Sequence, residues 1–354
     1  MPKLTLNDIC QYRNENMLST DLSDNVYIST ETMQPNREGI SSSDIVTPTT
    51  KKVKAFYPGD ILVSNIRPYF KKIWRATFAG GCSNDVLVFS PKCNSEYLYW
   101  LLSTDSFFNY MMATSKGTKM PRGDKKAIMK YIVPDHSDKE QRQIASFLNP
   151  LQNKIALNNR INDYLAELVS LMFERLIEKC VETVPLSTYA TISSGKRPPT
   201  KSPVFTDECV FPLFGASSQM GYTSEYLTDE KLLVIGRVGT HGVVQRVSGK
   251  AWPSDNTLVI RSDHYETASQ LLQRVDYPSL NRGSTQPLIT QGDLKNYEVP
   301  RISPVALERF EDQAGQLMSL YDHNCIESAK LIELRDALLP RLMSGELDVS
   351  GVTI

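Results

Sequence analysis

The sequence lacks most of the patterns that bind a metal or span a membrane. Its six cysteines form no C-x-x-C pair, and its four histidines complete no zinc-binding spacing. No apolar run is as long as a membrane span, and the N-terminus has no charged start followed by an apolar stretch. We therefore expect a soluble, cytoplasmic protein with reduced, buried thiols, no metal site and no membrane partner.

A cofactor-binding loop is also missing. GRVGTHG (236–242) matches neither G-x-G-x-x-G nor a Walker loop, and its place between two strand-like runs predicts a hairpin turn. NIRPY (65–69) only faintly resembles the Asn-Pro-Pro-Tyr loop of adenine methyltransferases, because Arg67 replaces the first proline. No spaced nuclease cluster is formed by the carboxylates Asp60, Asp85 and Asp255. Catalysis by this chain is not expected, and it should bind no cofactor of its own.

Net charge is low, but the charge is unevenly distributed. The total is −1, yet residues 1–137 carry 17 Lys and Arg against 13 Asp and Glu, and residues 303–354 carry 4 against 9. Residues 138–180 and 181–302 are each balanced. A neutral total can hide a basic face, so the charge leaves nucleic-acid binding open.

The sequence repeats itself. CSNDVLVF (82–89) returns as PSDNTLVI (253–260), 171 positions later, and GDILVSNIR (59–67) meets EKLLVIGRV (230–238) at the same offset. Further along the offset becomes 166, where Gly117 and Pro121 meet Gly283 and Pro287, and KYIVP meets NYEVP. Matches in one order with a drifting offset indicate a duplicated unit with loop insertions. At offset 171, Leu62 aligns with Leu233.

Each half begins with short apolar runs broken by Gly, Pro, Ser and Asn, which predict β-rich units with a few helices such as 95–103. Each half then ends in a helical segment with heptad spacing. The seam consists of Ile144, Leu148, Leu151, Ile155, Asn158, Asn162, Leu165, Val169, Met172 and Leu176 in the first segment, and of Phe310, Ala314, Leu317, Tyr321, Asn324, Ser328, Leu331, Arg335, Leu338 and Leu342 in the second.

Two readings of the seams remain open. Each helix could pack on its own globule, or the two could pair with each other, which their matched lengths and polar centres favour. Leu334 is expected to replace Arg335 in the seam. Pro150 predicts a short helix leading into a longer one. The predicted class is α+β with a pseudo-two-fold internal repeat and two long antiparallel helices.

Several passages resemble the specificity subunits of type I restriction–modification enzymes, and together they cover nearly the whole chain. They are FYPGDILVSNIRPYFKKIWRATFAGGCSNDVLVFSP (56–91), EQRQIASFLNPLQNKIALNNRINDYL (140–165), LFGASSQMGYTSEYL (213–227), LLVIGRVGTHGVVQRVSGKAWPSDNTLVI (232–260), GSTQPLITQGDLKNYEVP (283–300) and LRDALLPRLMSGELDV (334–349).

The resemblance implies an architecture and partners. It implies target-recognition domains at 1–137 and 181–302, spacer helices forming a coiled coil at 138–180 and 303–345, and a tail at 346–354. Each domain would read one half of an asymmetric bipartite site in double-stranded DNA. Two adenine-N6 methyltransferase subunits, which use S-adenosylmethionine, would dock on the helices. Restriction subunits that use ATP with Mg²⁺ would join them in a phage-defence complex.

Basic and amide side chains in the loops are the candidate DNA contacts. Lys and Arg can neutralise phosphates, and Arg, Asn and Gln can read base edges. The candidates are Lys51, Lys52, Lys54, Asn65, Arg67, Lys71, Lys72, Arg75, Lys116, Lys119, Arg122, Lys196, Arg197, Lys201, Gln219, Arg237, His241, Arg282 and Gln286.

Three alternatives stay open. The chain could be the DNA-recognition subunit of another phage-defence modification assembly. It could be a coiled-coil scaffold with two protein-binding domains, or a stand-alone nuclease or methyltransferase.

Overall fold

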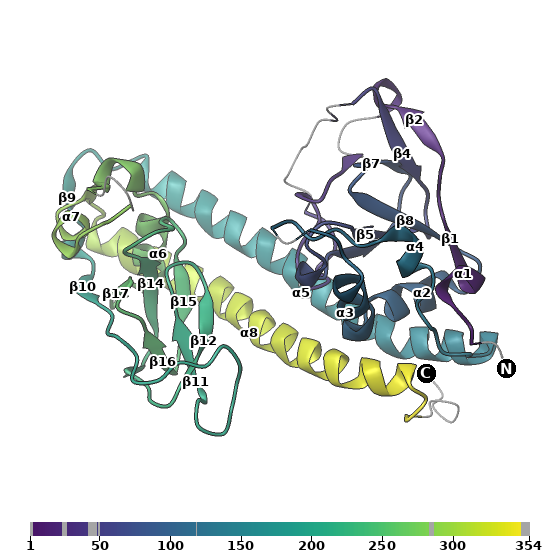
Figure 1. Cartoon of the computed structure of the whole chain (residues 1–354). Helices are drawn as coiled ribbons and strands as arrows, with labels where there is room; N and C mark the ends of the chain where they lie inside the picture. Colours follow the sequence, from purple (N-terminus) through teal and green to yellow (C-terminus); the bar gives the residue numbers. More distant parts are fainter. Residues whose placement is uncertain are drawn as a thin grey trace. The chain divides into compact units, whose positions relative to one another are not determined.

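The computed structural model describes residues 3–22, 27–41, 48, 50–117, 119–282 and 287–347, and the chain divides into two compact units (Figure 1). Unit 1 consists of Met1–Asn159 and Cys325–Ile354, and unit 2 of Arg160–Asn324. Both units combine sheets with helices, which confirms the α+β class and the two sheet-rich domains. Two helices of 40 residues, α5 (Asp138–Ile177) and α8 (Pro304–Met343), each contribute to both units.

Unit 1 contains two four-stranded sheets. The first is antiparallel, in the order β1 (Cys10–Tyr12), β8 (Val86–Pro91), β5 (Ile61–Ser64) and β6 (Ile73–Arg75). The second has the order β2 (Asn16–Leu18), β4 (Lys52–Phe56), β7 (Gly80–Cys82) and β3 (Tyr27–Ile28), with β3 parallel to β7. The short helices are α1 (Leu6–Ile9), α2 (Ser95–Leu102), α3 (Asp105–Ala113) and α4 (Lys125–Ile128), and the 3₁₀ turns are Ser19–Asp21 and Pro68–Phe70. The helix predicted at 95–103 is confirmed.

Unit 2 has a first sheet of the same order, β10 (Thr191–Ser194), β17 (Thr257–Arg261), β14 (Leu232–Gly236) and β15 (Gln245–Val247). The second runs β12 (Gln219–Thr223), β11 (Phe211–Phe214), β16 (Lys250–Pro253) and β13 (Thr228–Asp229), with β11 parallel to β16. The remaining elements are β9 (Thr183–Pro185), β18 (Glu298–Pro300), α6 (Tyr265–Gln273), α7 (Gln291–Lys295) and the 3₁₀ turns Leu186–Thr188 and Tyr277–Leu280. The antiparallel pairing of β14 with β15 confirms the hairpin predicted around 236–242.

One inner strand of each first sheet, β5 in unit 1 and β14 in unit 2, is buried on both faces. All four residues of β5 and all five of β14 are buried. Ile61 and Val63 pack in a large core with α2 and α3, whereas Leu62 packs in a smaller core with Phe56 and Val88. Burying one such aliphatic side chain contributes roughly 1.5–3 kcal/mol. This two-sided burial explains why the strands are continuous apolar runs without alternation.

The sequence alignment at offset 171 is wrong by one residue on this strand. Val63 lies opposite Leu87 on β8, and Ile235 lies opposite Leu258 on β17, which is the equivalent leucine of the repeat. The offset on this strand is therefore 172. Val63 and Ile235 accordingly face the two large cores, and Leu62 and Val234 the two small ones. A one-residue slip exchanges the two faces of a strand, so Leu62 corresponds to Val234 and not to Leu233.

The helices α5 and α8 contact each other in both units and run antiparallel. In unit 1, Asn158 Nδ2 donates to Ser328 Oγ at 3.2 Å, and Arg335 Nη1 donates to Gln152 Oε1 at 2.9 Å. A lower number on α5 thus faces a higher number on α8, as an antiparallel pair requires.

In unit 2, Asn324 Nδ2 donates to Asn162 Oδ1 at 2.9 Å, and Asn162 Nδ2 donates to the carbonyl oxygen of Tyr321 at 3.2 Å. The rings of Phe173 and Phe310 lie 5.1 Å apart. The polar residues of the two helices therefore meet within each unit, where a buried polar pair fixes helix register.

Two expectations about these helices are wrong. Pro150 does not break α5, which is one helix from Asp138 to Ile177, because Pro150 is exposed and Leu148 beside it is fully buried in the unit 1 core. Leu334 does not replace Arg335 in the seam. Arg335 is 3% exposed and bonded to Asp336 and Gln152, whereas Leu334 is 47% exposed.

The thiols only partly match expectation. None of the six cysteines, all of which lie in the described part of the chain, forms a disulfide; Cys10, Cys82 and Cys209 are buried, but Cys325 is exposed. Within the described part of the chain, no helix combines the length and apolarity that crossing a bilayer demands.

Candidate nucleic-acid interface

In unit 1 three segments distant in sequence are tied together at the end of β5. The backbone N–H of Asn65 donates to the carbonyl of Asp85 at 2.8 Å, and that of Arg67 donates to the carbonyl of Pro121 at 2.9 Å. The N–H of Gly123 donates to the carbonyl of Asn65 at 3.3 Å. A Cβ at Gly123 would lie 2.9 Å from Asn65 Oδ1 and from Ile128 Cδ1, so a larger residue there would displace these two side chains. These bonds bring the candidates Asn65 and Arg67 beside the segment that carries Arg122.

Unit 2 makes the same bonds at the end of β14. The N–H of Arg237 donates to the carbonyl of Asn256 at 2.8 Å, that of Gly239 to Pro287 at 3.1 Å, and that of Ile289 to Arg237 at 3.0 Å. Asn65 therefore corresponds to Arg237 and Asp85 to Asn256. The two halves repeat their backbone bonding here while carrying different side chains. Gln286 lies outside the described residues.

The repeated stretches that include Ser83 and Ser254 form equivalent turns. The N–H of Ser83 donates to the carbonyl of Ile28, and that of Ser254 to the carbonyl of Phe214, both at 2.9 Å. Each serine carbonyl then accepts from the residue three positions on, at 3.0 Å. We call 83–85 the unit 1 turn and 254–256 the unit 2 turn.

Seven candidate cations have partners within their own unit. Arg122 pairs with Asp85 at 3.2 Å and Lys116 with Asp124 at 2.9 Å. The other five bond as follows: Lys54 to the carbonyls of Asn84 and Val86, Lys72 to the carbonyl of Thr30, Lys71 to Asp105, Arg75 to Glu96, and Arg282 to Asp293. Burial lowers the pKa of Lys54 and of Lys72. Lys54 and Lys72 thus serve the fold of unit 1.

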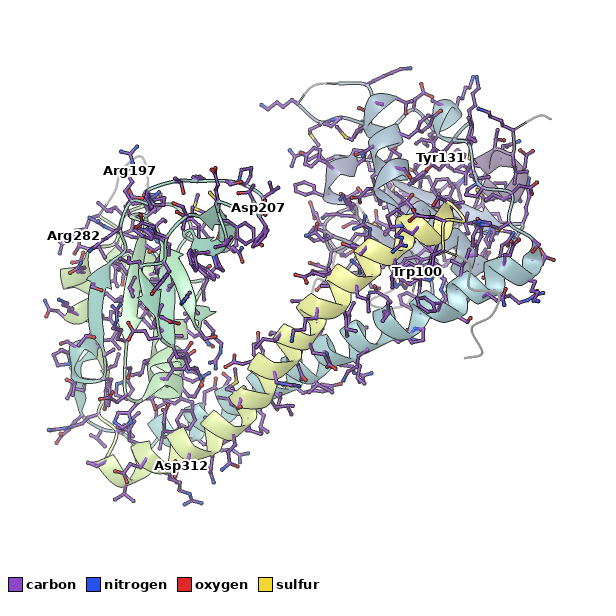
Figure 2. All side chains as sticks on the ribbon, turned by 90° about the horizontal axis from the view of Figure 1, so that it is seen from below. Trp100, Tyr131, Arg197, Asp207, Arg282 and Asp312 are labelled. Carbon is purple, nitrogen blue, oxygen red and sulfur yellow. The ribbon has the colours of Figure 1, made fainter. Side chains whose placement is uncertain are left out.

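Other candidate cations are exposed, and within the described ranges none has an ion pair. They are Lys51, Lys52, Lys119, Lys196, Arg197 and Lys201. Gln219 is also exposed, its amide donating to the carbonyl of Gly221 at 3.3 Å. Figure 2 shows Arg197 and Arg282 at the end of unit 2 away from Asp312 on α8.

Buried polar atoms without a partner gather at the same places. Considering described residues only, Asn65 Oδ1 and Arg67 Nε are buried and unbonded in unit 1, and Arg237 Nε and His241 Nε2 in unit 2. His241 Nδ1 lies 3.1 Å from the carbonyl oxygen of Gly236. An unsatisfied buried polar group costs about 1–3 kcal/mol, so these atoms suit a ligand that supplies the missing bonds.

Sequence reasoning missed Asn84 and Asn256 as candidates, and considered Asp85 and Asp255 only as parts of a nuclease cluster. The usable signal was the repeat itself, which transposes Asn-Asp to Asp-Asn between otherwise similar strands. The described residues contain no group of three or more His, Cys, Asp or Glu side chains able to hold a metal.

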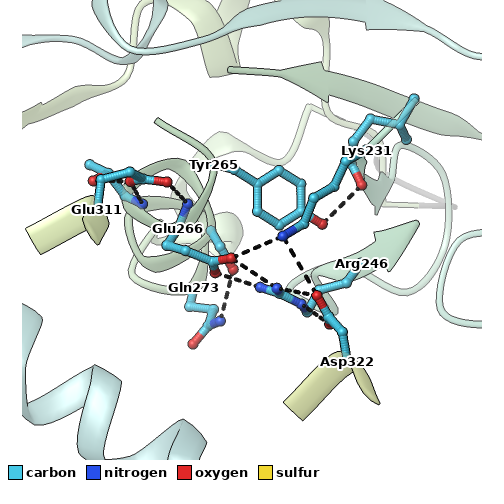
Figure 3. Close-up of polar contacts among 10 residues, drawn as sticks. Lys231, Arg246, Tyr265, Glu266, Gln273, Glu311 and Asp322 are labelled. Carbon is cyan, nitrogen blue, oxygen red and sulfur yellow. Dashed lines mark hydrogen bonds and ion pairs between the residues drawn. The ribbon is translucent and has the colours of Figure 1, made fainter. Parts of the chain in front are cut away.

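An ion network fixes the unit 2 sheet to its helices (Figure 3). Arg246 on β15 pairs with Glu266 on α6 at 2.6 Å and with Asp322 on α8 at 2.8 Å, and Lys231 pairs with Glu266 at 3.3 Å. Burial opposes the charge of Arg246, but the hydrogen bonds to Glu266 and Asp322 outweigh it and raise its pKa. The network holds β15, and with it the loop that begins at Arg237, in place on unit 2.

The two sheet-rich units share one order of their first sheet and one set of backbone bonds around the turn, and each contains segments of α5 and α8. Residues 2–167 match the family model of the type I restriction modification DNA specificity domain. The structure is similar to the crystal structure of a type I restriction–modification S subunit from M. genitalium, with a TM-score of 0.59 at 15% identity over 96% of this chain and 95% of that one.

Two curated proteins with similar sequences are also specificity subunits of type I restriction enzymes. The specificity subunit of the Escherichia coli type I restriction enzyme EcoDI is 29% identical over 33% of this chain and 26% of its own length. The MjaIX specificity subunit of Methanocaldococcus jannaschii is 22% identical over 72% of this chain and 69% of its own length. The match thus spans about a quarter of the E. coli subunit. These findings confirm the resemblance to type I specificity subunits.

Proposed function

We propose that this chain reads an asymmetric bipartite site in double-stranded DNA, with one unit on each half-site. The observation that supports it most is the pair of equivalent turns, held by the same backbone bonds and flanked by different polar side chains. A shared frame gives both units one docking geometry, and different side chains give them different base preferences.

The proposal is tested by selection from a pool of duplexes with a randomised central region, using the full chain with its methyltransferase partner. Two short unequal tracts separated by an unread spacer are expected. One continuous tract, or no enrichment at low salt, would overturn it. The second outcome favours a protein-binding scaffold.

The α5–α8 pair sets the spacer length in this proposal. Inserting one heptad after Ala156 in α5 and one after Ala329 in α8 preserves the seam and adds about 10 Å of helix. At 3.4 Å per base pair, the spacer should lengthen by about three base pairs, with both tracts unchanged. A longer spacer with altered tracts, or an unchanged spacer, would contradict this role.

Two methyltransferase subunits dock on the helices in this proposal, and they bring S-adenosylmethionine. Leu168 in unit 2 is 46% exposed and its repeat equivalent in unit 1, Leu334, is 47% exposed. Equivalent apolar positions suit two copies of one partner. Each of Leu168→Glu and Leu334→Glu should reduce the stoichiometry from two partner copies to one by native mass spectrometry. Val181→Glu, at a position 98% exposed beyond α5, is the matched control.

The chain itself is non-catalytic in this proposal. Restriction subunits that use ATP with Mg²⁺ complete the complex. The isolated chain should neither methylate DNA with S-adenosylmethionine nor cleave it with Mg²⁺ and ATP. Either activity in the isolated chain would contradict the assignment.

A further inference from the structure

A cleft of about 450 Å³ opens in unit 2 between residues 197–201 and the unit 2 turn. Leu213, which is fully buried, and Met220 line its apolar part. Its volume lies within the usual range for small-molecule sites. The cleft lies in the half of the chain with the fewer basic residues.

The turn on one side of the cleft is rigid and carries unused polar groups. Ser254 is 3% exposed, lines the cleft, and its Oγ has no partner among the described residues. The carbonyl of Ser254 accepts from Thr257 Oγ1 at 2.7 Å, and that of Asn256 from the N–H of Arg237 at 2.8 Å. The side chains of Asp255 and Asn256 are exposed, and neither bonds to a described residue. The turn therefore carries two exposed side chains and one buried hydroxyl, that of Ser254, and none of the three bonds to a described residue.

The other side of the cleft carries positive charge. Arg197 and Lys201 line it, are exposed, and form no ion pair within the described ranges. The segment is tied to the turn because the N–H of Lys196 donates to the carbonyl of Pro253 at 3.1 Å. A Cβ at Gly195 would lie 2.1 Å from the carbonyl oxygen of Ser254, so only glycine allows this approach. The cations are thereby held beside the turn.

We infer that this cleft seats the sugar–phosphate of one nucleotide in the unit 2 half-site while Asn256 contacts the edge of an adenine. Cations opposite hydrogen-bonding side chains, above an apolar floor, match the phosphate, base and sugar of a nucleotide. Asn pairs bidentately with adenine N6 and N7. Arg197 and Lys201 supply the phosphate contacts, which carry affinity and its salt dependence. The inference rests on the proposed function and names one of its contacts.

The corresponding place in unit 1 is occupied differently. Asp85 corresponds to Asn256, and its carboxylate bonds to Arg122. The carbonyl of Asn84 accepts from Lys54 at 3.1 Å. The side chain equivalent to Asn256 is thus paired within unit 1, whereas that of Asn256 bonds to no described residue, so we place the adenine contact in unit 2.

The test repeats the duplex selection with variants of the full chain. Asn256→Asp replaces the adenine contact by a carboxylate that accepts from cytosine N4. The preferred base at one position of one tract should then change from adenine to cytosine. The ratio of cytosine to adenine at that position should rise by about 10- to 100-fold, with the other tract unchanged. Asn256→Ala should relax that position. Asn159→Asp, an exposed asparagine on α5, is the matched control and should leave both tracts unchanged.

The phosphate contacts are tested on the selected duplex. Replacing Arg197 and Lys201 by Ala should weaken all sequences alike and lower the slope of log affinity against log salt by about one per residue. Arg301→Ala, which removes an exposed arginine paired with Glu182, is the control.

The outcomes separate the two proposals. If the unmodified chain selects no two-tract site, the proposed function fails. If it selects one but Asn256→Asp leaves every preferred base unchanged, only the cleft inference is overturned. The same holds if the Arg197 and Lys201 variant keeps the full salt slope. Thermal midpoints equal to those of the unmodified chain show that the exposed substitutions leave the fold intact.

Discussion

The turns of the two units share their backbone hydrogen bonds but differ in how their side chains are bonded. In unit 1, Asp85 holds Arg122, whereas in unit 2 the equivalent residues are Asn256 and Leu288, which cannot form an ion pair. The unit 2 turn instead borders an open cleft with free cations. The duplicated frame therefore carries two different sets of polar groups, as the proposed reading of two different half-sites requires.

A second difference lies at the sheet edges. Three strands of each second sheet pair alike, but β2 lies beside β4 in unit 1, whereas β12 lies beside β11 in unit 2. The added strand thus covers opposite edges of the shared core. The two units therefore share the backbone bonds of their turns and differ in the side chains and edge strands around those turns.

The largest expected effect concerns the anchoring of unit 2. Arg246→Ala leaves Glu266, whose side chain is 3% exposed, without its main partner. Breaking a buried pair in this way costs about 3–5 kcal/mol, so urea unfolding should begin at clearly lower denaturant. Arg301→Ala, in an exposed pair, should cost about 0.5 kcal/mol or less. Equal midpoints for the two variants would show that the network does not stabilise unit 2.

The helix contact in unit 2 should respond next. Asn162→Leu removes the acceptor of the Asn324 side-chain amide, and Asn324 is only 5% exposed. The free energy of unfolding, measured with urea, should fall by about 1–3 kcal/mol. Replacing both asparagines by leucine should recover most of this loss, because no orphaned group remains. A double variant less stable than either single one would contradict this explanation.

In unit 1, the pair of Asp85 and Arg122 should control one base of one tract. Arg pairs bidentately with guanine, worth about 1–3 kcal/mol of discrimination, and Asp85 orients it. Asp85→Asn and Arg122→Lys should both relax the same guanine position in duplex selection and leave the unit 2 tract unchanged. Relaxation of different positions would rule out a positioning role for Asp85.

The smallest expected effect is a pH dependence that one of the two equivalent N-cap residues has and the other lacks. Asp124 is the N-cap residue of α4 in unit 1, and its equivalent, Thr290, is the N-cap residue of α7 in unit 2. The hydrogen bond from Lys116 lowers the pKa of Asp124 to about 2. Its contribution is therefore present above the ordinary value of 3.8 and is lost as pH falls through about 2. NMR titration of the Asp124 carboxyl should show this midpoint, and Lys116→Ala should move it upward. A midpoint near 3.8 would contradict the pairing.

The fold was predictable to the extent that it depends on local pattern. Heptad spacing and repeated apolar runs indicate both long helices and both sheets. The alignment failed by one residue on β5 because a strand buried on both faces has no alternation to reveal its register. Pro150 and Arg335 were misjudged because their surroundings, an exposed helix face and Gln152, come from the fold.

The candidate site was predictable only as a set of loops. Sequence shows where cations are, but their partners lie far away along the chain, as Asp105 does from Lys71 and Asp85 from Arg122. Pairing of this kind distinguishes Lys54, bonded to carbonyls, from Arg197, which is free of ion pairs among the described residues. The sequence marks the unit 2 turn as part of the repeat but does not mark it as a contact, because asparagine and aspartate are ordinary turn residues.

The most direct test is to map methylated adenines in DNA from cells that express the chain together with a methyltransferase subunit of the proposed partner class. Two different short tracts separated by a fixed unread spacer are predicted. A palindromic pair of identical tracts, or a single continuous motif, would contradict the claim that the two units read different half-sites.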